Sequence, residues 1–201
     1  LTGGVPVPLP LKAENGFKLT AQELEAAITP RTKLIIFPFP CNPTGAVMRR
    51  EDLEPIAALL RDKDIIVLSD EIYAELTYGG ERHVSIASLP GMKERTVAIN
   101  SFSKNFVMTG FRVGNIVAPE PIARAVKSIN DSVVYSAPAP SQRAALHALR
   151  RRKELAAQIV PEFSARMAYG AQRIRALPGF TLSLRNNEAD YIVVEPLEQA
   201  G

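Results

Sequence analysis

Three polar segments of the sequence contain residue types that could do chemistry: CNPTG at 41–45, SDEIY at 69–73 and SFSKNFVMTGFR at 101–112. A lysine amine such as Lys104 can attack a carbonyl carbon, and the planar fork of Arg112 suits a phosphate. Read alone, each segment also has a structural explanation, because Asn, Pro and Gly shape turns, Asp70 could cap a helix and Lys104 could be a solvated cation. Each segment follows an apolar run, and α/β sheets bind ligands at the carboxyl ends of their strands. We therefore expect the three segments to meet at one edge of a sheet.

The three segments together resemble the motifs of a known family. Residues 101–114, SFSKNFVMTGFRVG, are similar to the lysine signature of the class I and II aminotransferases, which use pyridoxal phosphate (PLP). The match includes Ser103 before the lysine and Arg112 eight residues after it. CNPTG and SDEIY stand upstream in the family's order, and the resemblance extends from GGVP at 3–6 to about residue 190. It implies an α/β chain: the three-layer αβα large domain of fold type I PLP enzymes with a mostly parallel sheet, plus the beginning of the C-terminal small domain.

The resemblance implies catalytic roles for Lys104, Asp70 and Tyr73. Lys104 would hold the PLP aldehyde as a Schiff base and, once freed, move the proton between the substrate α-carbon and the cofactor. The pyridine ring is an electron sink only while its nitrogen is protonated, which requires a carboxylate partner. Asp70 is the candidate for that partner, because Glu71, its neighbour, would point to the opposite face of a strand.

The resemblance also implies which residues bind the rest of the cofactor. Asn42 and Tyr73 would form hydrogen bonds with the phenolic oxygen. Ser101, Ser103 and Arg112 would bind the phosphate, with Ser101 and Arg112 as the family's usual contacts. Two further residues of the first motif are given no role in binding the cofactor. Thr44 is interpreted as shaping the turn of the motif, and Cys41 is interpreted as a packing residue.

Alternating strands and helices would position these residues, which favours a mostly parallel sheet. The apolar patterns predict strands at 33–37, 65–68, 95–99, 112–117 and 180–184, with 33–37 buried on both faces, and another strand at 191–194. They predict helices at 20–28, 51–61, 121–130, 141–149 and 152–177. Thr20 and Glu23 have the spacing of a capping box, and Pro161 should kink or divide the last helix. We expect residues 1–150 to form the PLP-binding large domain and residues 151–201 to form the linking helix and the start of the small domain.

Composition excludes several classes of protein. The chain has 201 residues, 46% of them hydrophobic, and its 24 Lys and Arg against 21 Asp and Glu give a net charge of +3. This small, scattered surplus argues against a nucleic-acid-binding tail or a polybasic membrane anchor. The single cysteine, Cys41, cannot form an intrachain disulfide, and the apolar runs are too short to span a bilayer. We expect a cytoplasmic protein, with no nucleic-acid or membrane partner. His83 and His147 lie in no Cys or His cluster, so no metal site is expected.

The sequence therefore predicts a PLP-dependent aminotransferase that moves the amino group of an amino acid to a 2-oxo acid. YSAP at 135–138 resembles a loop that approaches the neighbouring subunit in the family's homodimers, so a homodimer is expected. The family's N-terminal phosphate-binding helix start is not found, and Arg185 comes too early to be its substrate-carboxylate arginine. We expect this chain to be the central part of the enzyme, a segment that could be inactive alone. The alternatives are a PLP-dependent C–S lyase of the same fold, an aminotransferase-like effector domain of a transcription regulator, and an inert fragment.

Overall fold

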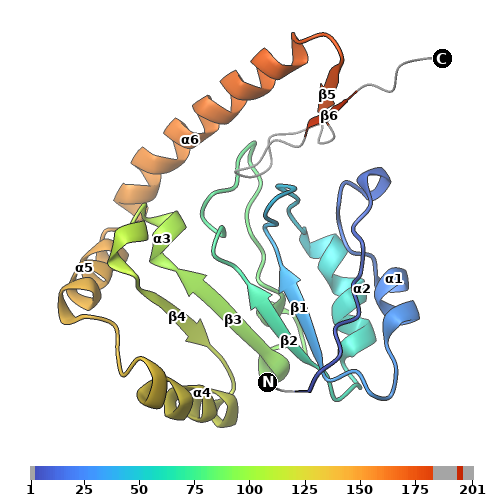
Figure 1. Ribbon diagram of the computed structural model, residues 1–201, viewed down its shortest axis with the longest axis vertical. Helices are drawn as coiled ribbons and strands as arrows, with labels where there is room; N and C mark the ends of the chain where they lie inside the picture. The colour runs from blue at the N-terminus through green and yellow to red at the C-terminus, as the bar shows by residue number, and fades with distance from the viewer. Residues whose placement is uncertain (1–2, 183–193, 197–201) are drawn as a thin grey trace.

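The computed structural model describes residues 3–182 and 194–196 of the chain. Its centre is a four-stranded sheet in the order β1–β2–β3–β4 (Figure 1). Strands β1 (Leu34–Pro38), β2 (Ile66–Asp70) and β3 (Thr96–Ser101) are parallel, and β4 (Gly114–Val117) is antiparallel to β3. The chain is thus α/β with a mostly parallel sheet, as the sequence predicts.

The register of the strands brings their carboxyl ends to one edge of the sheet. Asp70 pairs with Pro38 on one side and with Ile99 on the other. Strands β2 and β3 both run two residues beyond their predicted ends, because a ladder of backbone hydrogen bonds accepts polar side chains as readily as apolar ones. This extension places Asp70 and Ser101 inside the sheet, where neighbouring strands fix their backbones.

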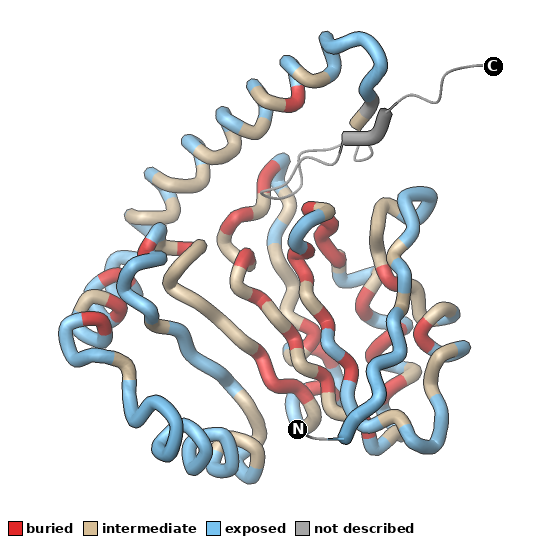
Figure 2. The backbone as a smooth tube through the Cα atoms, in the orientation of Figure 1, coloured by how far each residue is buried: buried red, intermediate tan, exposed pale blue. Residues whose placement is uncertain are grey.

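Helices α1 (Ala21–Ala27) and α2 (Arg50–Leu60) pack on one face of this sheet (Figure 1). The predicted capping box is confirmed: Thr20 Oγ1 accepts the N–H of Glu23 at 3.2 Å, and Glu23 Oε2 accepts the N–H of Thr20 at 3.0 Å. The buried side of α2 meets the inward side chains of β1 and β2 in the main core, shown red in Figure 2. Its most buried members include Leu24, Phe37, Leu53, Ile56, Leu60, Val67 and Met92.

The opposite face of β1 is exposed, so the expectation that this strand is buried on both faces is wrong. Ile35 and Phe37 are buried, whereas Leu34 and Ile36 are 51% and 67% exposed. An unalternated apolar run shows that both faces are suited to burial, but it cannot show which partner covers the second face. Within the described residues, helices cover only one side of β1.

The remaining helices are the 3₁₀ helices η1 (Ala13–Asn15), η2 (Ile86–Ser88), η3 (Lys93–Arg95) and η4 (Thr109–Phe111), and the helices α3 (Phe102–Asn105), α4 (Glu120–Val133), α5 (Ala139–Arg150) and α6 (Arg152–Arg175). Of these, α4, α5 and α6 lie where the sequence predicts helices, whereas α3 and the 3₁₀ helices were not predicted. Helix α6 continues through Pro161, so it is not divided there. Its side chains on both sides of the proline, including Ile159 and Phe163, pack against the loop that follows β2, and this packing supports the helix where the proline donates no hydrogen bond.

A second sheet follows α6. It consists of β5 (Phe180–Leu182) and β6 (Val194–Pro196), which are antiparallel. The strand predicted at 180–184 begins at the expected residue. The residues of the strand predicted at 191–194 that precede Val194, and Arg185, lie outside the described residues. The division of the chain into domains at residue 150 stays a prediction.

Candidate functional site

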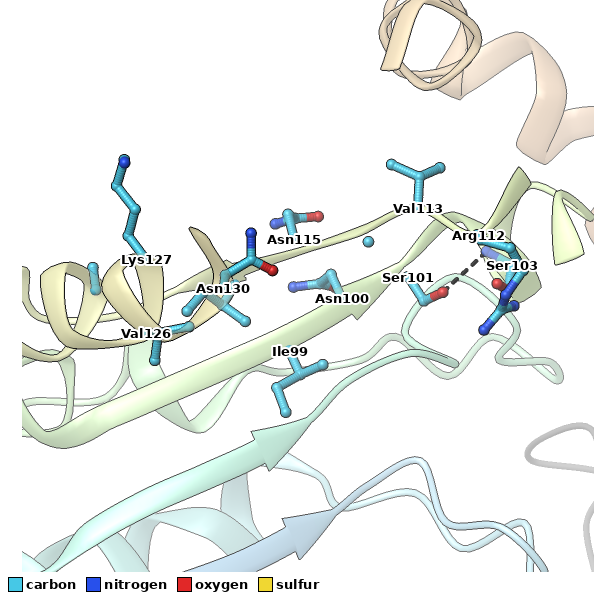
Figure 3. Close-up of a pocket in the computed structure, with 13 residues that line it drawn as sticks. Ile99, Asn100, Ser101, Ser103, Arg112, Val113, Asn115, Val126, Lys127 and Asn130 are labelled. Carbon is cyan, nitrogen blue, oxygen red and sulfur yellow. Dashed lines mark hydrogen bonds between the residues drawn. The ribbon is translucent and has the colours of Figure 1, made fainter. Parts of the chain in front are cut away.

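Three residues proposed to bind phosphate line one cavity. Ser101, Ser103 and Arg112 lie at one end of a cavity of about 590 Å³ between β3, β4 and α4 (Figure 3). Asn115, Lys127 and Asn130 line its other end. The cavity thus offers two hydroxyl groups and a guanidinium at one end, which are the donors that a phosphate requires.

The backbone holds two of these side chains in place. Ser101 is the last residue of β3 and the N-cap of α3, and its Oγ accepts the N–H of Ser103 at 3.1 Å (Figure 3). Arg112 has a left-handed backbone, with φ 51° and ψ 51°, and its guanidinium donates to the Thr109 carbonyl at 3.0 Å. A left-handed conformation costs a non-glycine residue about 1–2 kcal/mol. This backbone directs the Arg112 side chain to the wall of the cavity.

A close approach between β3 and β4 fixes the spacing of the cavity wall. Ser101 pairs with Gly114, and a Cβ atom at Gly114 would lie 2.7 Å from the backbone oxygen of Asn100. Only glycine fits this position without displacing a strand. The glycine therefore sets the distance between Ser101 on β3 and Arg112, two residues before Gly114.

Lys104 lies on α3, in contact with the loop that follows β2. Its Nζ is 5.7 Å from the centre of the Tyr73 ring, within the range of a cation–π contact, and Tyr73 is buried. The next residue, Asn105, is also buried, and its Oδ1 accepts the N–H of Glu75 at 3.2 Å. The lysine turn and the Tyr73 loop are thus joined by two side chains. The sequence analysis missed Asn105, whose signal is its place directly after the lysine.

Asp70 and Glu71 point to opposite faces, as strand alternation predicts. Asp70 is partly exposed, and its Oδ1 accepts the N–H of Ile72 at 3.2 Å. Glu71 shares a face with Ser69, whose hydroxyl donates to Glu71 Oε1 at 3.1 Å. The Asp70 carboxylate is therefore partly accessible to solvent, whereas the Glu71 carboxylate is buried.

Glu71 belongs to a buried polar cluster that the sequence analysis missed. The Ser85 hydroxyl donates to its Oε1 at 2.6 Å, and His83 Nε2 lies 3.2 Å from its Oε2 without the linear geometry of a hydrogen bond. Burial alone would raise the pKa of Glu71, but the His83 imidazole and the hydroxyls of Ser85 and Ser69 outweigh it and lower that pKa. Glu71 therefore stays ionised although its side chain is only 7% exposed.

The first motif forms a tight loop after β1. The N–H of Cys41 donates to the Ala46 carbonyl at 3.0 Å, the N–H of Gly45 donates to the Cys41 carbonyl at 2.7 Å, and Cys41 is a buried core residue. Thr44 Oγ1 accepts the N–H of Ala46 at 3.3 Å, in agreement with a turn-shaping role. Asn42 is exposed, and the peptide bond between it and Pro43 is cis.

The structure brings the predicted residues together only in part. Ser101, Ser103 and Arg112 share the cavity, and Lys104 contacts Tyr73. Asp70 and Asn42 follow neighbouring strands at the same edge of the sheet, but they do not line the cavity, and neither do Lys104 and Tyr73. In residues 3–182 and 194–196, no group of three His, Cys, Asp or Glu residues could hold a metal ion. None of the helices in these ranges combines the length and the hydropathy needed to cross a bilayer.

Comparisons with known proteins identify the family of the chain. The family described as "Aminotransferase class I and II" matches residues 1–198. The chain is 50% identical to "Putative aminotransferase YugH" of Bacillus subtilis over 77% of its own length and 40% of that protein. It is 45% identical to "Aspartate aminotransferase" of Pyrococcus abyssi over 75% of its length and 39% of that protein.

A solved structure has the same fold over nearly the whole chain. The aspartate aminotransferase of Thermus thermophilus, in a double-mutant form, superposes with a TM-score of 0.88 at 32% identity. The match covers 96% of this chain and 50% of that structure. The chain thus spans about half the length, or less, of the relatives it matches.

Proposed function

Because this chain belongs to the class I and II aminotransferases, which are PLP-dependent, we propose that it carries the cofactor-binding centre of an enzyme that transfers an amino group from an amino acid to a 2-oxo acid. The observation that supports this most is the cavity in which Ser101, Ser103 and Arg112 converge, next to the turn that carries Lys104. Two hydroxyls and a lysine within four residues, with an arginine eight residues further on, are what an aldehyde-bearing phosphate ester requires.

The residues present fit PLP. The phosphate is a dianion, and two hydroxyls and a guanidinium lie together for it at the end of β3. The pyridine nitrogen needs an anionic partner, and Asp70 is a partly exposed carboxylate on the neighbouring strand. When bound, PLP supplies an electron sink for charge that develops on the substrate α-carbon.

The protein's own side chains would do the remaining work. The Lys104 amine would hold the aldehyde carbon of PLP and take or return the proton at the substrate α-carbon. The Asp70 carboxylate would hold a proton on the ring nitrogen. The Tyr73 hydroxyl and the Asn42 amide would orient the phenolic oxygen, and contact with the Tyr73 ring would keep the lysine side chain within reach.

The finer assignments are part of the same proposal. We propose a homodimer, which the exposed apolar residues at the end of α4 support: Val133, Val134 and Tyr135 are 72%, 62% and 78% exposed. A cytoplasmic location is supported by the single free cysteine. The proposed substrates are small molecules, with neither nucleic acid nor membrane as a partner. The proposed domain boundary at residue 150 falls between α5 and α6.

Covalent labelling tests the role of Lys104. The full-length protein is incubated with PLP, reduced with borohydride, digested and mapped by mass spectrometry. We expect the pyridoxyl mass on the peptide that contains Lys104 and its loss in Lys104→Ala. Lys127→Ala is the matched control, because Lys127 lines the same cavity but pairs with Asp131. A label that persists in Lys104→Ala and disappears in Lys127→Ala would refute the assignment.

The products identify the reaction. An aminotransferase given an amino acid without an acceptor should release one 2-oxo acid per site and then stop. Continuous release of ammonia and pyruvate from a sulfur-containing amino acid would instead identify a C–S lyase. If PLP is bound but no amino acid reacts, the effector domain of a regulator becomes the better interpretation.

A further inference from the structure

We propose that the buried pair of Glu71 and His83 is a positioning device for the end of β2, and that it holds Asp70 and Tyr73 in the orientation that PLP needs. This inference rests on the proposed function. Asp70 lies on the solvent-accessible face of the sheet edge. The side chain of the next residue, Glu71, lies on the buried face, where it meets His83. The pair therefore lies behind the site and would act through the backbone.

The cluster is built to hold Glu71 as an anion. A buried carboxylate is unfavourable unless hydrogen bonds and a counter-charge compensate it. Glu71 Oε1 accepts hydrogen bonds from both Ser85 and Ser69, and its Oε2 faces His83 Nε2 at 3.2 Å. The side chain of His83 is only 13% exposed, so water does not replace either partner freely. The two hydroxyl hydrogen bonds to one buried carboxylate oxygen restrict the segments that carry Ser69, Glu71 and Ser85.

The cluster joins two segments that are distant along the chain. Ser69 lies in β2 and Glu71 directly follows this strand, whereas His83 and Ser85 precede η2. Ser85 is also the N-cap of η2, where its Oγ accepts the N–H of Ala87 at 3.3 Å. The carboxylate of Glu71 is thus anchored to a segment that has its own local structure.

Backbone hydrogen bonds carry this anchoring to the proposed site residues. The N–H of Glu71 donates to the Ile99 carbonyl at 2.9 Å, which extends the β2–β3 ladder by one residue. The Glu71 carbonyl accepts the N–H of Ala74 at 3.0 Å, and this turn encloses Tyr73. Asp70 precedes Glu71 directly, and its own Oδ1 accepts the N–H of Ile72. A shift of Glu71 would therefore displace both residues that the proposed function assigns to the PLP ring.

The test compares Glu71→Gln with Glu81→Gln in the full-length protein. Glu81 is the matched control, because it lies in the same loop and pairs with Arg49 at a distance from β2. We expect Glu71→Gln to weaken PLP affinity about tenfold, by analogy with the loss of a supporting hydrogen-bond partner in metal sites. We also expect it to shift the visible absorbance of bound PLP. Glu81→Gln should leave the PLP affinity within about twofold of wild type and the visible absorbance of bound PLP unshifted.

Two further measurements separate positioning from general stability. Hydrogen exchange of the Ile72 and Ala74 amides should accelerate in Glu71→Gln and not in Glu81→Gln, because those amides bond to Asp70 and Glu71. If Glu71 and His83 act as a unit, the double variant with His83→Gln should lose no more PLP affinity than Glu71→Gln alone. Glu71→Asp, which keeps the charge, should recover part of the affinity.

The outcomes are distinct. A wild-type protein that takes up no PLP would overturn the proposed function itself. Normal PLP uptake by the wild type, with Glu71→Gln equal to Glu81→Gln in affinity and absorbance, would overturn only the positioning role. If Glu71→Gln does not fold by circular dichroism, His83→Gln is the deciding variant, since it leaves both serine hydrogen bonds to Glu71 in place.

Discussion

At the scale of single residues, Asp70 and Glu71 show how one peptide bond separates two chemical environments. Asp70 is partly exposed and accepts one backbone N–H, whereas Glu71 is buried among two hydroxyls and an imidazole. The alternation of side chains along β2 is enough to produce this difference. The sequence predicts which of the two faces the site. It cannot predict that His83 lies behind Glu71, because the path of the intervening loop is set by tertiary contacts.

The role of Asp70 can be tested by a nearly isosteric change. Asp70→Asn removes the charge and keeps an oxygen that can accept the Ile72 N–H, so we expect the protein to fold and bind PLP. Without a carboxylate to hold the ring proton, the single-turnover rate of 2-oxo acid formation should fall about 100-fold or more. Stopped-flow absorbance measures this rate. Asp64→Asn is the control, because Asp64 is 93% exposed and its ion pair with Lys33 lies at the surface. Wild-type rates in Asp70→Asn would contradict the assignment.

At the scale of elements, the antiparallel pair of β3 and β4 shapes the cavity, and Gly114 makes this pairing possible. The link between Asn105 and Glu75 extends the framework, because Glu75 also forms an ion pair with Arg152 at the start of α6. The turn that carries Lys104 is therefore connected to both the sheet and the long helix. These connections, more than helix propensity, fix a helix as short as α3.

The requirement for glycine at 114 leads to a stability prediction. Gly114→Ala places a Cβ 2.7 Å from the Asn100 oxygen, so β3 and β4 must separate. We expect a loss of about 1–3 kcal/mol in the free energy of unfolding, as overpacked sites show, together with weaker PLP binding. Gly110→Ala is the control, because a Cβ there meets nothing within 4 Å. Urea denaturation measures both variants, and an equal effect of the two would contradict the steric explanation.

The elements that the sequence predicts best are those with local signals. The capping box at Thr20 and the apolar face of α2 fix their helices through neighbours three or four residues away. The three motif segments likewise place Asp70, Ser101 and Lys104 at strand ends. The exposed face of β1 and the undivided α6 are different, since both depend on which surface packs against them. Local pattern does not contain that information.

At the scale of the whole molecule, several elements expose large apolar side chains. Helix α4 has no buried residue, and Val126 and Ile129 are exposed on it, as are Ile116 and Val117 on β4. The exposed face of β1 adds Leu34 and Ile36. Apolar patches of this kind mark interaction surfaces. Because the chain spans about half the length of its relatives, or less, stability and binding are best measured in the full-length protein.

The stability of that protein should depend on pH through Glu71. The pKa of Glu71 in the folded state lies below its ordinary value of 4.5, so folding favours the ionised form. This contribution is complete above pH 4.5 and is lost as the pH falls through the folded-state pKa. We expect the free energy of unfolding to fall more steeply between about pH 5 and pH 3 in wild type than in Glu71→Gln. Urea denaturation across this range measures the difference.

A matched control separates Glu71 from the other carboxylates. Hydrogen bonding to Arg49 also lowers the pKa of Glu81, but this group lies near the surface, where solvent screens the interaction. Glu81→Gln should therefore keep the wild-type slope. Parallel slopes for wild type and Glu71→Gln would show that the buried carboxylate does not contribute to acid unfolding.

The left-handed backbone of Arg112 has a consequence for protein engineering. A procedure that selects sequences for thermal stability alone would place glycine or asparagine at this position, because either residue adopts φ 51° with less strain. The same choice would remove the guanidinium from the end of the cavity that we propose for the phosphate. Under the proposed function, stability and cofactor retention therefore make opposite demands on this one residue, and a design that improves thermal tolerance should leave it unchanged.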